Sequence, residues 1–263
     1  MTTLFLYALC SGAVAGWLAG LFGIGGGLVL VPIFIALFSW QGFPGEYRVI
    51  MAVATSLATI LVTGLASLRA HHRFGAVPWP VVKTLTPSIL LGAWCGAAIA
   101  HALPVPMLQT LLALWLLYAG LRMVYPPSLS AAASAPTQWY WRGMGFAIGV
   151  LSALTGIGGG TLTVPLLVKR RFPLLNAIAA ASACGIPIAL SGSLNYIYLG
   201  WQQPALPEGS FGFIHLPTFA GVVITSALTA PFGARLAHRL PTARLKRYFA
   251  LVLIVAAGKL LFA

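Results

Sequence analysis

Apolar residues occur in long, almost uninterrupted stretches, and this pattern predicts membrane-spanning helices. Stretches of at least about 17 residues, long enough to cross a bilayer, lie near residues 3–39, 48–69, 80–101, 104–124, 139–168, 174–199, 212–234 and 245–262. The first and the fifth are too long for one plain helix. Only 6% of the residues are charged, against about a quarter in a soluble domain. We therefore expect an all-α polytopic membrane protein.

The two longest stretches contain the same glycine cluster. GIGGGLVLVP at residues 23–32 recurs as GIGGGTLTVP at residues 156–165, with seven of ten positions identical. Residues 100–114 also match residues 237–251, and ATSL at 54–57 matches AASA at 180–183 more weakly. Many secondary transporters are duplicated in this way. We predict a first repeat at residues 1–124, a linker at 125–138 and a second repeat at 139–263.

The positions of the basic residues predict that the two repeats are inverted. Lys and Arg mark cytoplasmic loops. If each glycine cluster breaks its segment into a helix-break-helix hairpin, and three transmembrane helices follow, all fifteen Lys and Arg except Arg48 and Lys259 fall on one side. Eight simple spans divide them nine to six instead. The favoured hairpin arrangement places both acidic residues, Glu46 and Glu208, on the outer side.

The glycine clusters predict a binding site for an anion. Consecutive glycines do not form a stable helix interior, because each costs about 0.8–1 kcal/mol relative to alanine. The helix that restarts after each break presents unpaired N–H groups and the positive end of its dipole, which attract anions. The candidate substrate-binding residues are glycines of both clusters and nearby hydroxyl residues: Gly25, Gly26, Gly27, Thr55, Ser56, Gly158, Gly159, Gly160, Thr161 and Ser182.

The absence of acidic residues from the apolar segments excludes several classes of function. No Asp or Glu lies within an apolar segment, which argues against a carboxylate proton relay and against a carboxylate-ligated cation site. We expect no metal, no cofactor and no enzymatic activity. Nucleic acid is not an expected partner, because the basic residues occupy short loops rather than one soluble face. The expected partners are a small anion, the lipid bilayer and protons as a coupling ion.

The sequence assigns the histidines and cysteines roles in topology and packing rather than in chemistry. We expect His71 and His72 to lie in a basic loop. Cys10, Cys95 and Cys184 are expected to be buried and to pack as small hydrophobic residues.

A passive anion channel and a cysteine-dependent sulfur-relay membrane protein are the alternative functions. The G-x-x-x-G spacing in GWLAG, residues 16–20, predicts close packing between helices.

At the duplicated GIGGGxxxVP, the ATSL motif and the ending GARLAHRLPTARLKRYFALVLIVAAGKLL at residues 233–261, the sequence resembles the sulfite exporter TauE/SafE family. The resemblance implies secondary transport of a small sulfur-containing anion across a bacterial inner membrane. Sulfite, a sulfonate such as sulfoacetate, and thiosulfate are the implied substrates. The chain departs from the commoner pattern at Ala181, where the second copy often has Thr before Ser. This departure predicts that the second site is less polar than the first.

Overall fold

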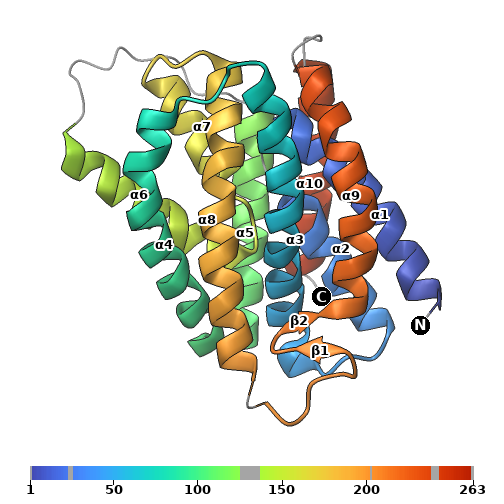
Figure 1. Ribbon diagram of the computed structural model, residues 1–263. Coiled ribbons are helices and arrows are strands. Elements are labelled where there is room, and N and C mark those ends of the chain that lie inside the picture. Colours follow the sequence, from blue (N-terminus) through green and yellow to red (C-terminus); the bar gives the residue numbers. More distant parts are fainter. Residues whose placement is uncertain (1, 23–25, 125–136, 202, 238–242, 262–263) are drawn as a thin grey trace.

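The computed structural model describes residues 2–22, 26–124, 137–201, 203–237 and 243–261, and these are helical apart from loops and one short hairpin (Figure 1). The first half contains α1 (Thr2–Phe22), α2 (Gly27–Trp40), α3 (Gly45–Arg73), α4 (Trp79–Ala102) and α5 (Val105–Val124). The second half contains α6 (Gln138–Thr155), α7 (Gly160–Lys169), α8 (Leu174–Gly200), β1 (Ser210–Phe211), β2 (Ile214–His215), α9 (Leu216–Ala237) and α10 (Ala243–Leu261). Gly25 and most of the predicted linker at 125–138 lie outside the described residues.

The helices confirm an all-α, multi-pass membrane architecture. Among the described residues, five helices are long and apolar enough to cross a membrane: Gly45–Arg73, Trp79–Ala102, Val105–Arg122, Leu174–Gly200 and Leu216–Leu236. The two stretches that are too long for one helix are each divided in two, the first into α1 and α2 and the second into α6 and α7. The interruption of both stretches at their glycine clusters is therefore confirmed.

Each broken helix pair returns to the side on which it begins. The rings of Tyr7 in α1 and Trp40 at the end of α2 lie 5.9 Å apart between centroids. In the second pair, the guanidinium carbon of Arg170, which follows α7, lies 4.4 Å from the ring centroid of Tyr140 in α6. In Figure 1 the α1–α2 pair opens toward the lower end of the molecule and the α6–α7 pair toward the upper end.

The centre of the molecule is formed by α3 and α8, which run antiparallel. Near one end, the Tyr47 hydroxyl of α3 donates to Oε1 of Gln203, just after α8, over 3.2 Å. Near the other, the hydroxyl oxygens of Ser67 and Ser182 lie 3.1 Å apart. Most residues of both helices are buried, because the remaining helices surround them.

Small residues bring two pairs of outer helices into close contact. A Cβ on Gly16 of α1 would lie 2.5 Å from Cα of Ser226 in α9, which confirms the packing predicted from the G-x-x-x-G spacing. Likewise, a Cβ on Gly96 of α4 would lie 2.9 Å from Cα of Val150 in α6. In each half, therefore, the first helix packs against the fourth helix of the other half.

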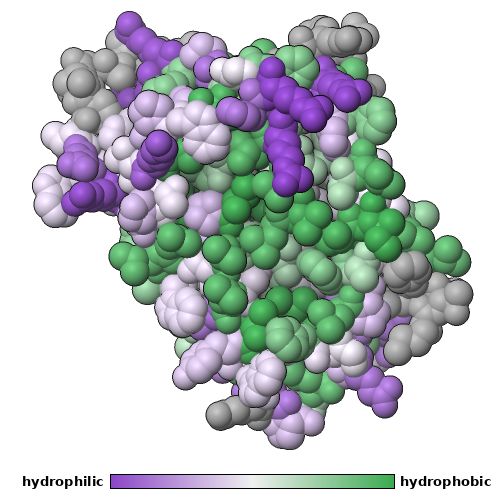
Figure 2. Space-filling view, in the orientation of Figure 1, coloured by the Kyte–Doolittle hydropathy of each residue, from purple (hydrophilic) through white to green (hydrophobic). Residues whose placement is uncertain are grey.

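Basic side chains gather at one end of the molecule. Figure 2 shows hydrophilic side chains concentrated toward the upper end, above a band of hydrophobic ones. The helix ends and loops found there carry Arg69, Arg73, Lys83, Arg122, Arg142, Lys169, Arg170, Arg171 and Arg235. Glu46, Arg48 and Glu208 lie at the opposite end, at the start of α3 and after α8. These nine basic residues therefore lie at the end of the molecule opposite to both acidic residues.

Two predictions from the sequence are wrong. His71 is not in a loop: α3 continues to Arg73, and the buried His71 ring places Nε2 3.2 Å from the carbonyl oxygen of Gly20. Cys184 is buried as expected, but Cys10 and Cys95 are exposed on α1 and α4. An apolar sequence does not show which helix faces meet protein, because the faces that meet lipid are equally apolar.

Candidate functional site

The two glycine clusters adopt the same backbone conformation where their second helices begin. Gly26 precedes α2 with φ 78° and ψ −15°, and Gly159 precedes α7 with φ 71° and ψ −12°. This left-handed conformation costs other residues about 1–2 kcal/mol. This cost explains why both copies of the repeat have glycine at this position. Neither helix start receives a hydrogen bond from a capping side chain.

The start of α7 has unused hydrogen-bond donors. The N–H groups of Leu162 and Thr163 turn back to the Gly159 carbonyl. Among the described residues, the N–H groups of Gly160 and Thr161 donate to no protein acceptor. The buried Thr161 hydroxyl also has no partner there. Three donors and the positive end of the helix dipole are thus available to an anion.

The two breaks are in direct contact with each other. Gly27, at the start of α2, packs against the carbonyl of Gly156, and a Cβ on Gly27 would lie 2.9 Å from Cα of Ile157. Gly156 itself has φ 70°, and its own Cβ would lie 2.9 Å from the carbonyl oxygen of Val53 in α3. The unwound segments therefore meet beside α3, and no larger side chain fits between them.

The hydroxyls of Thr55 and Ser56 are both engaged within the protein. The Ser56 hydroxyl donates to the Gly156 carbonyl over 2.9 Å, and Thr55 accepts the N–H of His215 over 3.0 Å. Both serve to hold other backbone segments, and both side chains are fully buried. Ser56 thus supports the second break by satisfying a carbonyl that the end of α6 leaves unpaired.

The structure places Ser182 away from the other hydroxyls. Its hydroxyl pairs with that of Ser67, eleven residues along α3 from Ser56, a separation of about 16 Å along a helix. Gly158 instead faces α8 three residues further along, since a Cβ on Gly185 would lie 3.3 Å from the Gly158 carbonyl oxygen. Of the predicted residues, Gly27 and Ser56 therefore meet Gly156 at the second break, whereas Ser182 lies one helical turn from the residue of α8 that faces Gly158.

Three further hydroxyls, those of Thr163, Ser193 and Ser210, are buried without a partner among the described residues. Thr163 in α7 is fully buried, and Ser193 in α8 is 3% exposed. Buried polar atoms without a partner are uncommon in native structures. Thr161 and Thr163 thus give the first turn of α7 two buried hydroxyls without a partner among the described residues. Sequence patterns did not distinguish them from the hydroxyls that bond to their own helix, such as Thr155 with Leu151.

A buried histidine covers the site at the end that carries Glu208. His215 in β2 makes edge contacts with the stacked rings of Phe38 and Phe43, with centroid distances of 5.7 and 5.1 Å. Its Nδ1 lies 2.8 Å from the Thr218 hydroxyl. Burial lowers the pKa of His215 to about 4, although a hydrogen bond with the Glu208 backbone opposes the shift. His215 is therefore neutral at physiological pH.

Sequence reasoning missed His215 because nothing in its spacing indicates a role. It is the last residue before α9, and its contacts with Phe38 and Thr55 join positions at least 160 residues apart. Only the packing of the short β1–β2 hairpin against α3 brings them together.

Comparison with the sequences of known proteins shows to which family the chain belongs. The profile of the family described as "Sulfite exporter TauE/SafE" matches residues 8–260. The chain belongs to the sulfite exporter TauE/SafE family. It is 38% identical over 261 residues to a "Probable membrane transporter protein" of Haemophilus influenzae, with 98% of both chains covered. No solved structure gives a significant match.

More distant relatives in the TauE/SafE family have similar names. A "Probable membrane transporter protein" of Methanocaldococcus jannaschii is 24% identical over 241 residues, covering 89% of this chain and 87% of the relative. One of Xylella fastidiosa is 27% identical over 264 residues, covering 94% and 91%. These names and the apolar helices identify this TauE/SafE member as a multi-pass membrane transporter, and none of the names is that of an enzyme.

Proposed function

We propose that this protein is a secondary transporter that moves a small sulfur-containing anion across the bacterial inner membrane by alternating access. Sulfite, a sulfonate such as sulfoacetate, and thiosulfate are the substrates proposed. The observation that carries the proposal is the contact between two glycine breaks of the same conformation, next to donors at the start of α7 that have no protein partner. The family name supports the sulfur oxyanion class.

Alternating access requires two parts that move against each other, and we propose two inverted repeats. The packing supports this: α1 lies along α9, and its counterpart α6 lies along α4. The contacts of α3 with α9 are likewise matched by those of α8 with α4. The hairpins open toward opposite ends, and α3 and α8 are antiparallel. Rocking of one repeat against the other would expose the breaks to each side in turn.

In the proposed complex, the anion oxygens accept hydrogen bonds from the backbone of both breaks. Gly158, Gly159, Gly160 and Thr161 supply the second half of the site, with the Thr161 hydroxyl as an added donor. The glycines of the first cluster, Gly25, Gly26 and Gly27, supply the first half. Thr55 and Ser56 hold the surrounding backbone in place, and Ser182 belongs to the part of the path nearer the basic end.

We propose protons as the coupling ion and the basic end as the cytoplasmic side. The chain has only two acidic residues, and both lie at the opposite end, so a proton would travel on the substrate rather than on a buried carboxylate. The placement of Arg and Lys at one end supports the orientation through the positive-inside rule. Sulfite is suited to such coupling because its pKa lies near neutrality.

Uptake into proteoliposomes tests the proposal. Purified protein is reconstituted and given labelled sulfite, thiosulfate, sulfoacetate, taurine or sulfate, with and without an imposed pH gradient. The proposal predicts saturable uptake of one sulfur anion, acceleration by the gradient, and exchange of internal for external label. Flux that neither saturates nor exchanges would identify a passive channel. Loss of flux on replacing Cys10, Cys95 and Cys184 with serine would favour the cysteine-dependent sulfur relay.

A further inference from the structure

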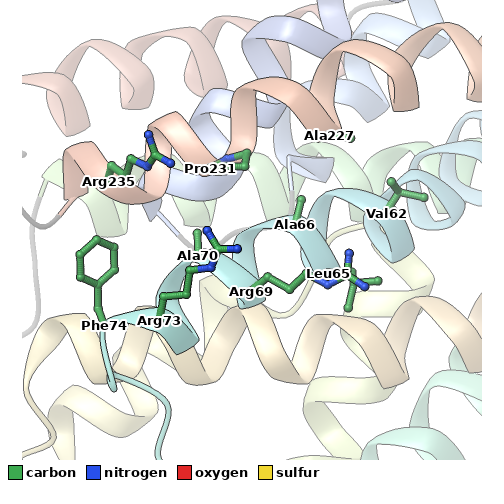
Figure 3. Close-up of a pocket in the computed structure, with 10 residues that line it drawn as sticks. All are labelled: Val62, Leu65, Ala66, Arg69, Ala70, Arg73, Phe74, Ala227, Pro231 and Arg235. Atoms are coloured by element: carbon green, nitrogen blue, oxygen red, sulfur yellow. The ribbon is translucent and has the colours of Figure 1, made fainter.

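A pocket of about 540 Å³ lies between α3 and α9 at the basic end of the molecule, away from the helix breaks (Figure 3). Three arginines line it: Arg69 and Arg73 from α3, and Arg235 from α9. Arg73 extends from α3 toward α9, and Arg69 extends along α3 toward Leu65. The rest of the lining is mainly apolar, from Val62, Leu65, Ala66, Ala227 and Pro231. The pocket is therefore cationic at one end and apolar at the other.

The positive charge of this pocket has no counterion within the protein. Glu46 and Glu208 are the only acidic residues in the chain, and both lie at the opposite end of the helices. Arg73 and Arg235 lie in the last turns of their helices, where the helix dipole favours a cation. Arg69 lies one turn earlier, so the dipole does not account for its position. Three guanidinium groups in the lining of one pocket, with both acidic residues at the opposite end, favour an external anion.

The pocket lies at the outer surface of the helices, since Leu65, Arg69 and Arg73 in its lining are exposed. Two large apolar side chains of α9 flank it and are exposed, Leu228 at 66% and Phe232 at 63%. In a protein that spans a membrane, such side chains meet hydrocarbon. Figure 2 shows hydrophilic side chains at the upper end of α3 and α9 directly above hydrophobic ones. An occupant with a charged end and an apolar chain matches both parts of the pocket.

We propose that this pocket binds an acidic phospholipid of the surrounding membrane. The phosphate accepts hydrogen bonds from Arg69, Arg73 and Arg235, since guanidinium groups match phosphate oxygens in a bidentate geometry. One acyl chain lies along the apolar lining near Leu65 and Ala66. Basic pockets between membrane helices on the cytoplasmic side bind acidic headgroups by this same combination of charge and shape. The proposal does not depend on which anion the protein transports.

Native mass spectrometry of the full-length protein in detergent tests the proposal. The protein is titrated with phosphatidylglycerol and, separately, with phosphatidylcholine of the same acyl chains. We expect at least one tightly bound phosphatidylglycerol per chain and weak binding of phosphatidylcholine. Changing Arg69, Arg73 and Arg235 together to Gln should weaken phosphatidylglycerol binding by about a hundredfold, as expected for the loss of three interfacial cations. Equal binding of the two lipids would overturn the proposal.

The chain offers a matched control for this triple variant. Lys83, Arg122 and Arg142 lie at the same end of the molecule, are exposed, and do not line the pocket. Changing them together to Gln removes the same total charge and should leave the affinity within about twofold. An equal loss in this control would overturn the proposal, because it would show general electrostatic attraction. Changing the three pocket arginines to Lys keeps the charge and should retain the preference for phosphatidylglycerol.

Two further measurements separate the lipid from a soluble anion and from a folding defect. Millimolar glycerol phosphate or sulfite should not displace bound phosphatidylglycerol, because neither has an acyl chain. Displacement by either would overturn the proposal in favour of a soluble-anion site. Ala66→Phe fills the apolar part and leaves all three arginines, so it should weaken phosphatidylglycerol binding even if the triple Gln variant does not fold. Unchanged binding by Ala66→Phe would contradict the placement of the acyl chain.

Discussion

The hydroxyl of Ser56 donates a hydrogen bond to the carbonyl of Gly156, 2.9 Å away, and so joins α3 to the second helix break. Both residues are buried. A break in a membrane helix leaves carbonyl groups that neither the helix nor lipid can satisfy. The bond explains how this break persists, and it engages the Ser56 hydroxyl, which is therefore a support of the proposed anion site rather than a free donor in it.

Replacement of Ser56 should therefore lower stability. Ser56→Ala leaves the Gly156 carbonyl without this donor and should reduce the free energy of unfolding by about 1–3 kcal/mol. Thermal unfolding in detergent measures the change. Ser88→Ala is the control, because the Ser88 hydroxyl bonds only to Leu85 of its own helix, and it should lose less than about 0.5 kcal/mol. Equal unfolding midpoints for the two variants would contradict the supporting role.

The left-handed glycine at the second break provides a test that separates strain from function. Gly159→Ala and Gly42→Ala impose the same backbone strain, since the φ angles are 71° and 72°, at a cost of about 1–2 kcal/mol each. At Gly159 the added Cβ would also lie 2.6 Å from Cδ1 of Ile188, the end of a flexible side chain that must shift. Gly42 lies in a loop with no atom within 4 Å of an added Cβ. We expect both variants to be destabilised, but only Gly159→Ala to lose anion uptake in proteoliposomes. Full uptake by Gly159→Ala would count against substrate binding at this break.

Removal of the Thr161 hydroxyl should weaken anion binding without lowering stability. Thr161→Val preserves shape, and the lost hydroxyl has no protein partner among the described residues. Loss of a hydrogen bond to a charged ligand should raise the Kd for the transported anion by about 10- to 100-fold. Thr155→Val is the control, because the Thr155 hydroxyl bonds to the Leu151 carbonyl. It should leave the Kd unchanged, as measured by calorimetry.

Acidification should destabilise the protein through His215. Burial lowers the pKa of its imidazole to about 4 in the folded protein, below the value of about 6.5 of an unfolded chain. The unfolded state therefore takes up the proton first, and stability falls as the pH drops from about 6.5 to 4, by at most about 3 kcal/mol. His215→Gln should flatten this part of the profile of unfolding midpoint against pH. An unchanged profile would show that His215 does not titrate in this way.

The inverted arrangement can be tested by labelling from each side of the membrane. In a background without native cysteines, His72→Cys and Ala205→Cys place exposed thiols in the last turn of α3 and after α8, at opposite ends of the helices. A membrane-impermeant maleimide added to spheroplasts should label only Ala205→Cys, and labelling of His72→Cys should require inverted vesicles. Labelling of both from the same side would refute the proposed topology.

The sequence predicted the helices and their interruptions because these depend on local properties. Each of these properties depends on a single segment of the sequence: the length of an apolar stretch, the cost of consecutive glycines, and the positions of Arg and Lys. The partners of Thr55, Ser56 and Ser182 were not predictable, since each bond joins segments at least 100 residues apart. His71 was misplaced because a polar run at a helix end resembles a loop. The pocket of Arg69, Arg73 and Arg235 likewise exists only when α3 and α9 pack together.

The central claim is that the second break lines the path of the transported anion, and thiol protection tests it most directly. Thr161→Cys is made in a background in which Cys10, Cys95 and Cys184 are serine and transport is retained. We predict that a small hydrophilic maleimide labels this thiol and that the transported anion slows labelling, with half-maximal protection near its KM. The anion should not slow labelling of Ala205→Cys. A thiol at position 161 that labels at the same rate with and without the anion would contradict the account.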